Sequence, residues 1–181
     1  MRYVIDDTGL RTCGTRTCWN KLVPGKTRIF YWRLWLDKLP TKAKLVVKGI
    51  NPADTCCPFC HYQSEDRLHL FICCPKVKEV QKAVNSWWMI FPDDEDAKEM
   101  VFSTVQYLRK AKYDQIKDAV IQAYSWIIWK ARNNAIFNNM HVNPLNIANE
   151  IQSLVFEWIR SRSRGGSNLN WFQWCCNPNA L

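Results

Sequence analysis

The chain has 181 residues, a formal net charge of +9 and 48% apolar residues, with ten Trp, six Tyr and eight Phe. This composition is ample for a buried core and excludes wholesale disorder, and the length suits one domain or a small domain with a helical extension. The longest apolar run, Ala119 to Trp129, falls well short of the about 20 residues that cross a bilayer, so no membrane association is predicted.

The cysteine pattern indicates a reducing compartment. Nine cysteines are an odd number, and the residues after Met1 turn acidic at Asp6 and Asp7 instead of forming an apolar leader. We therefore expect an intracellular location, with no signal that separates nucleus from cytoplasm.

Positive charge is concentrated in the first third of the chain. Residues 1–55 carry eleven Lys or Arg against four acids. Such an excess predicts contact with a polyanion, nucleic acid before an anionic membrane surface. A solvated lysine-rich face is the alternative.

Two helices are predicted before the first cysteine motif. Residues 1–18 lack a clear period and are expected to be a loosely ordered remnant. Residues 24–39 have helical periodicity, with an apolar stripe of Ile29, Trp32 and Leu36 that Phe30 and Leu34 widen. A short helix is then predicted between a capping threonine and a terminating glycine, Thr41 and Gly49. Its inward residues are expected to be Leu45 and Val46, and its solvent-facing residues Lys42, Lys44 and Lys48.

A metal-binding motif follows, with the spacing Cys-x2-Cys-x8-His-x4-Cys formed by Cys57, Cys60, His69 and Cys74. Three thiolates and one imidazole suit tetrahedral zinc, and a full set of four protein ligands is typical of a structural site. One structural Zn²⁺ is therefore predicted. Neighbouring residues leave other registers open: Cys56, Cys73 and, as a substitute nitrogen, His61. Buried or disulfide-forming cysteines beside a core histidine are the non-metal alternative.

Four further helices are expected. Pro75 suits a first helical position, and Val77, Val80 and Val84 share one face. The acidic run 93–96 is interpreted as complementing the dipole of the following helix, whose helical pattern continues from residue 101 to a basic end at residues 109–112. A long helix, broadly apolar and hence central to a bundle, should run from about residue 114 to 138, and the last from Asn143-Pro144 to Gly165-Gly166.

The predicted fold is mainly α, with a small Cys3His zinc knuckle within or beside a helical bundle and little or no sheet. The predicted segments are the remnant 1–18, a zinc-binding domain 19–92, a helical extension 93–164 and a tail 165–181. The tail contains Trp171, Phe172 and Trp174, so it either packs back on the bundle or offers an apolar surface to a protein partner.

The order of these motifs resembles one family. The segments that carry the resemblance are Phe30-Tyr31-Trp32-Arg33-Leu34, Leu39-Pro40-Thr41, Lys48-Gly49-Ile50, the cysteine knuckle, His69-Leu70-Phe71 and Cys74-Pro75. Together they resemble the zinc-binding domain found carboxy-terminal to the reverse transcriptase of plant non-LTR (LINE-type) retrotransposons. Residues 129–133 and 136–137 are similar to a segment often found downstream of that domain.

The resemblance assigns the four ligand positions to Cys57, Cys60, His69 and Cys74. It places Glu65 at an acidic position four residues before the histidine, where support of a ligand is expected. Three positions depart from the family pattern: His61 replaces a common glycine, Asp66 a common threonine and Gln81 an expected tryptophan.

The predicted function is a non-catalytic, zinc-stabilised module that binds nucleic acid, RNA or an RNA/DNA intermediate before DNA. No enzyme is expected, because the thiols nearest a histidine are assigned as ligands and no polymerase or ribonuclease H carboxylate set is present. Tyr62 or an exposed tryptophan is expected to stack on an unpaired base. The predicted phosphate contacts are Lys26, Arg28, Lys42, Lys44, Lys48 and Arg67. A structural or protein-interaction module is the alternative.

Overall fold

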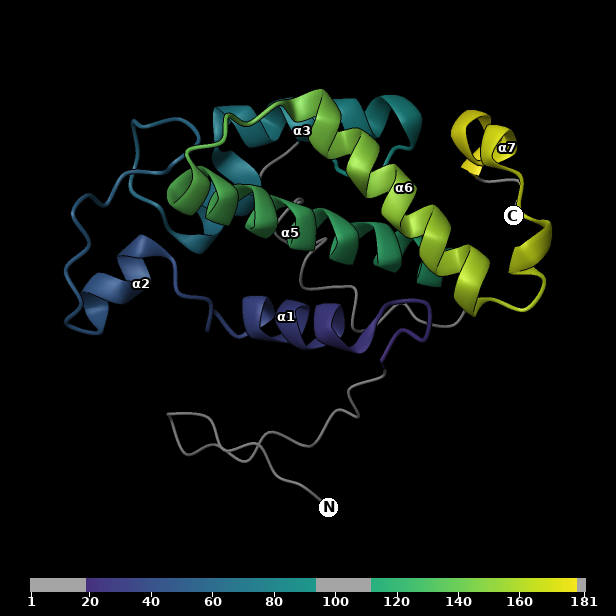
Figure 1. Cartoon of the computed structure of the whole chain (residues 1–181), viewed down its shortest axis with the longest axis horizontal. Coiled ribbons are helices and arrows are strands. Elements are labelled where there is room, and N and C mark those ends of the chain that lie inside the picture. Colours follow the sequence, from purple (N-terminus) through teal and green to yellow (C-terminus); the bar gives the residue numbers. More distant parts are fainter. Residues whose placement is uncertain (1–18, 94–111, 179–181) are drawn as a thin grey trace, which may run out of the picture.

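The computed structural model describes residues 19–93 and 112–178, which form a helical bundle (Figure 1). Its elements are α1 (Gly25–Trp35), α2 (Lys42–Val47), the π-helical turn η1 (His69–Cys73), α3 (Pro75–Trp87), α5 (Lys112–Asn138), α6 (Pro144–Arg162), the 3-10 turn η2 (Gly166–Asn168) and α7 (Trp171–Cys176). In these residues β pairing is limited to one bridge between Cys56 and Ser64. The mainly helical fold is confirmed.

Helix α5 is the centre of the bundle. Helix α1 packs along one side of it, and α6, which also contacts α3, packs on the other (Figure 1). Most of α5 between residues 116 and 128 is buried, as its broad apolar surface predicted. A single hydrophobic cluster extends from Leu22 to Trp174, so the segments predicted as 19–92 and 93–164 share one core. Over the described ranges, no helix is both long enough and apolar enough to cross a bilayer.

Helix α1 buries only part of the predicted apolar stripe. Phe30 and Leu34 are buried as expected, together with Thr27 and Tyr31, whereas Ile29 is 55% exposed. Apolar side chains surround this helix on several sides, so periodicity alone could not say which of them meets α5. The choice comes from contacts distant in sequence, such as the edge-to-face packing of Phe30 on Trp126, with centroids 5.2 Å apart.

The predicted helix starts are confirmed by their caps. The Thr41 hydroxyl accepts a hydrogen bond from the Lys44 amide, and the Asn143 side chain accepts from the amides of residues 145 and 146. Pro75 is the first residue of α3, whose predicted valine face is buried. The expectation for α2 was wrong in part: the helix has no fully buried residue, and Val46 is 42% exposed.

The carboxy-terminal tail folds back onto the bundle. The Trp174 side chain is fully buried, and its Nε1 donates to the Gln152 carbonyl over 3.0 Å. Trp87 Nε1 in turn donates to the Trp174 carbonyl over 3.0 Å. Trp171 and Phe172 remain exposed. Trp174 therefore attaches the tail to α6 through its own indole and to α3 through its backbone carbonyl.

Some predictions fall outside the described residues. They are the remnant 1–18, acidic residues 94–96, and the helical pattern assigned to residues 101–111.

Candidate metal centre

The four predicted zinc ligands lie together in the folded chain. Cys57, Cys60, His69 and Cys74 are all buried, and one ligand atom from each lies within 4.8 Å of the others. Cys57 Sγ is 3.9 Å from Cys74 Sγ, and Cys60 Sγ is 3.3 Å from His69 Nε2. Among the described residues the group does not include Cys56, Cys73 or His61, the neighbours that left the register open.

These separations fit a tetrahedral zinc ion. Zn–S bonds of about 2.3 Å and Zn–N bonds of about 2.0 Å imply tetrahedron edges of about 3.8 Å between sulfurs and about 3.5 Å between sulfur and nitrogen. The sulfur pair is far too widely separated for a disulfide, whose sulfurs are about 2.05 Å apart. All seven described cysteines are free. The donor set and its spacing therefore match a structural zinc site.

A tight knuckle positions Cys57 and Cys60. The His61 amide donates to the Cys57 carbonyl over 2.9 Å, and the Cys57 amide donates to the Gln63 carbonyl over 2.7 Å. The bridge between Cys56 and Ser64 closes the base of this loop. Hydrogen bonds within the loop backbone therefore hold both thiols in their buried positions.

The π-helical turn η1 positions the other two ligands. The Cys74 amide donates to the His69 carbonyl over 2.8 Å, a five-residue step that is wider than an α-helical turn. Asp66 Oδ1 accepts from the His69 amide over 2.7 Å and so holds the start of the turn. Asp66 therefore caps the turn at a position where the resembled family commonly has threonine.

The protonation pattern of the cluster is compatible with metal binding. The hydrogen bond from the Cys57 thiol to Cys74 Sγ raises the pKa of Cys57, as does burial, and it lowers the pKa of Cys74. Burial lowers the pKa of His69 and keeps its imidazole neutral, the form that binds metal. A zinc ion would deprotonate the thiols that it coordinates.

A buried ion pair joins the zinc loop to α5. Arg132 Nη2 lies 2.7 Å from Glu65 Oε1, and Arg132 Nε lies 3.1 Å from both carboxylate oxygens. The Glu65 side chain is fully buried and that of Arg132 is 6% exposed. Glu65 also accepts from the Lys42 amide at the start of α2 over 3.1 Å. One carboxylate thus connects the zinc loop, α2 and α5.

Sequence reasoning missed this pair. Glu65 was expected to support a metal ligand, but no hydrogen bond joins it to the cluster, and His69 Nδ1 is buried without a partner among the described residues. The expected role is corrected because the carboxylate is occupied by Arg132. The available signal was that Glu65 and Arg132 both lie in segments that resemble the family, although 67 residues separate them.

Gln81 has a polar role where the family has tryptophan. Its amide donates to Tyr124 Oη over 3.0 Å and to the carbonyls of Phe71 and Ile72 over 3.3 Å. Tyr124 also donates to the Phe71 carbonyl over 2.8 Å, and burial raises the pKa of its hydroxyl. These bonds satisfy carbonyls of η1 and attach that turn to α5.

His61 stands where the family has glycine, and its backbone has φ of +59°. A left-handed conformation strains a residue with a Cβ, whereas glycine adopts it freely. We expect His61→Gly to raise the free energy of unfolding by up to about 1 kcal/mol. Urea denaturation of the zinc-loaded chain measures this. Tyr62→Gly, at the adjacent exposed position outside the left-handed region, should instead lower stability; a loss of stability in His61→Gly would contradict the strain argument.

The predicted nucleic-acid contacts divide into two groups. Three of them face acids: Lys42 Nζ is 2.5 Å from Asp54, while Lys44 Nζ and Arg67 Nε lie 2.6 and 3.9 Å from the two oxygens of Asp37. Lys42 is also 2.8 Å from the Cys56 carbonyl, with a side chain only 11% exposed. This lysine thus braces the approach to the knuckle, where solvent exposure had been expected.

The second group has no ion-pair partner among the described residues. The Lys26 ammonium lies 5.7 Å from the Trp126 ring centroid, the Arg28 guanidinium lies 5.7 Å from that of Trp19, and Lys48 is exposed. Sequence reasoning omitted other exposed cations without such a partner, among them Arg33 and Lys38. Both were visible in the same basic segment.

Residues 5–80 match the model of a family described as zinc-binding in reverse transcriptase. The match includes all four clustered ligands and ends within α3. No curated protein and no solved structure matches the chain.

Proposed function

We propose that this chain, whose residues 5–80 carry a zinc-binding module of reverse-transcriptase origin, binds single-stranded RNA or an RNA/DNA intermediate without catalysing a reaction. The observation that carries the proposal is an exposed basic surface on α1 and α2, on the side of the bundle away from α3 and α6 (Figure 1). The zinc loop connects to this surface through Glu65, whose carboxylate accepts from the Lys42 amide at the start of α2.

One zinc ion bound by Cys57, Cys60, His69 and Cys74 would be structural. Four protein ligands complete a tetrahedral shell and leave no position for a reactive water. The two halves of the ligand set come from the knuckle and from η1, so the ion would lock the loop to the start of α3. Thiolate ligands are retained under reducing conditions, which supports an intracellular location.

The basic surface has an uneven charge balance. Residues 19–93 contain twelve Lys or Arg and six acids. Glu65 is withdrawn from the surface by Arg132 of α5, and Asp37 and Asp54 lie against the lysines of α2. Exposed cations without acidic partners in the described chain remain at Lys26, Arg33, Lys38 and Lys48. They are the proposed phosphate contacts.

Aromatic side chains accompany these cations. Trp19 and Trp35 are 42% and 41% exposed, and Tyr62 at the tip of the zinc loop is 88% exposed. Exposed rings beside positive charge are the usual means of holding unpaired bases without reading their sequence. Lys26, Ile29 and Arg33 share the outward face of α1 at helical spacing, which provides an uninterrupted stretch of surface for the strand.

Binding to single-stranded RNA is expected to depend steeply on salt. Four phosphate contacts predict a slope of about −3 in log K against log salt, hence a loss of about 50-fold in affinity between about 50 and 200 mM salt. Fluorescence anisotropy with labelled RNA measures this slope, and DNA of the same sequence tests the preference for RNA. Lys38→Gln with Lys48→Gln should make the slope shallower by about 1.4, since each single-strand contact contributes about 0.7.

A charge-matched control uses Lys82→Gln with Lys130→Gln, two exposed lysines of α3 and α5. This double variant loses the same charge and should keep the full slope, because Lys82 lies on α3 and Lys130 faces Glu150 of α6, which packs on the side of α5 opposite α1 (Figure 1). If both double variants made the salt slope shallower by the same amount, the attraction would depend only on net charge, and the assigned surface would be wrong. Absence of RNA and DNA binding at low salt would favour the protein-interaction module, for which exposed Trp171 and Phe172 offer a surface.

A further inference from the structure

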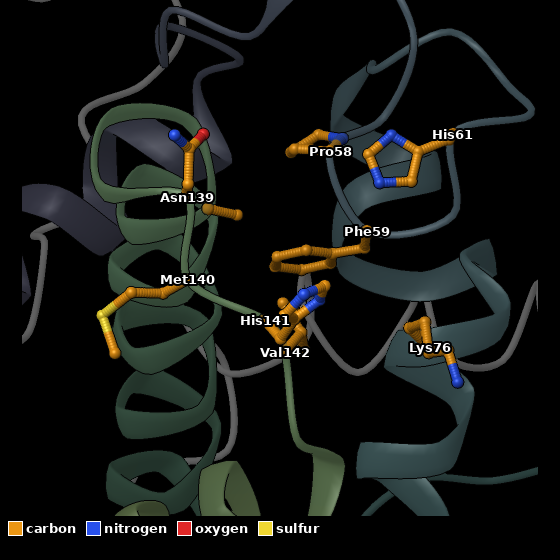
Figure 2. A pocket seen from close by; sticks show the side chains of 9 residues that line it. Pro58, Phe59, His61, Lys76, Asn139, Met140, His141 and Val142 are labelled. Atoms are coloured by element: carbon orange, nitrogen blue, oxygen red, sulfur yellow. The ribbon is translucent and has the colours of Figure 1, made fainter.

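A pocket of about 370 Å³ lies where the zinc knuckle meets the end of α5. The knuckle contributes Pro58, Phe59 and His61, and α3 contributes Lys76; Ala135 and the segment 139–142 form the opposite wall. Figure 2 shows the Phe59 ring between the two walls, with the His141 ring beside it. The volume is within the about 300 to 1,000 Å³ typical of small-molecule sites.

The lining combines apolar surface with hydrogen-bond donors and contains no carboxylate. Pro58, Phe59 and Val142 are the apolar part, and Lys76, Asn139 and the two imidazoles can donate. Lys76 Nζ lies 3.1 Å from Glu79 Oε1 on the surface of α3, with both side chains about half exposed. An exposed ion pair of this kind contributes little free energy, so the Lys76 ammonium can leave Glu79 and bind an anion in the pocket.

Residues with positive φ occur on both walls. The non-glycine residues with positive φ in the described chain are Asp37, His61 and Asn139, and the last two line this pocket from opposite sides. Asn139 follows the last residue of α5, where a left-handed Asn is an ordinary helix end. His61 is the strained one, and strained residues often persist at sites that bind ligands, because the conformation places their side chains.

We propose that this pocket binds one nucleotide unit of a single strand. The base packs against Phe59 and Val142, and the 5′-phosphate accepts hydrogen bonds from Lys76 and the His141 imidazole. The inference rests on the proposed nucleic-acid binding and adds a second contact region, on the zinc knuckle and not on α1. A planar apolar group joined to an anion is the ligand that matches this mixed lining.

AMP is the probe for this site. NMR titration of the zinc-loaded full chain should shift the side-chain signals of Phe59 and His141. Adenosine and inorganic phosphate should each bind at least about tenfold more weakly than AMP, since each lacks one of the two contacts. Lys76→Gln and His141→Ala should each lower the affinity for AMP by about tenfold, which is the factor expected for one charge-assisted hydrogen bond.

Lys82→Gln is the matched control, because Lys82 is exposed on the same helix but does not line the pocket. It should leave AMP affinity unchanged. Any one of three results would overturn the inference. The Phe59 and His141 signals do not move, inorganic phosphate binds as tightly as AMP, or Lys76→Gln and Lys82→Gln weaken AMP binding equally. Fluorescence anisotropy with labelled RNA on the same preparation separates the two proposals. RNA binding with no change in the pocket signals would contradict only the pocket proposal. AMP binding without RNA binding would contradict the function proposed for α1 and α2.

Discussion

Cys60→Ser is expected to abolish zinc binding and to unfold the loop that Cys57 and Cys74 close. The serine oxygen is a poor substitute for a thiolate, and a structural zinc contributes on the order of 10 kcal/mol of apparent binding energy that folding uses. Metal analysis of the wild-type chain should give one zinc per chain. The variant should contain none, and its thermal transition should be lost or markedly lowered.

The cysteine doublets provide matched controls. Cys56→Ser and Cys73→Ser change residues directly beside ligands, but both lie outside the cluster and are only partly buried. Each should keep one zinc and close to wild-type stability, while Cys57→Ser and Cys74→Ser should behave as Cys60→Ser does. If Cys56→Ser lost its zinc and Cys57→Ser retained it, the ligand register of the structure would be wrong.

Arg132→Met is expected to destabilise the zinc-loaded chain by about 3–5 kcal/mol, the range for removal of one member of a buried ion pair. The cost arises because Glu65, which is fully buried, would keep its charge with the Lys42 amide as its remaining hydrogen-bond donor among the described residues. Urea denaturation measures the loss. Zinc content should stay at one per chain, since Arg132 does not contact the cluster.

Two comparisons make this prediction specific. Lys130, on the same helix as Arg132, forms an exposed pair with Glu150 of α6, and Lys130→Met should cost less than about 1 kcal/mol. Glu65→Gln with Arg132→Met removes both charges, keeps an acceptor for the Lys42 amide, and should be more stable than Arg132→Met alone. A double variant no more stable than the single one would show that Arg132 acts by packing on Trp129, whose ring centroid lies 4.7 Å away.

Local signals accounted for much of the helical structure. Thr41, Pro75 and Asn143 marked the helix starts because a cap or a first-turn proline acts over a few residues. The buried valine face of α3 followed from its period, and the broad apolar surface of α5 indicated its central position. The inward face of α1 followed only in part, since Ile29 and Phe30 are both apolar and the packing of Phe30 against Trp126 is what distinguishes them.

The sequence by itself determined that four metal-ligand residues at zinc-finger spacing occur between two helical segments, because ligand chemistry and local backbone turns depend on near neighbours. It also located the excess positive charge. Only the tertiary structure decided which cations remain exposed, why Glu65 is buried, and where Trp174 docks. Those outcomes depend on partners such as Asp54, Arg132 and Gln152, which meet their counterparts only when distant segments pack on one core.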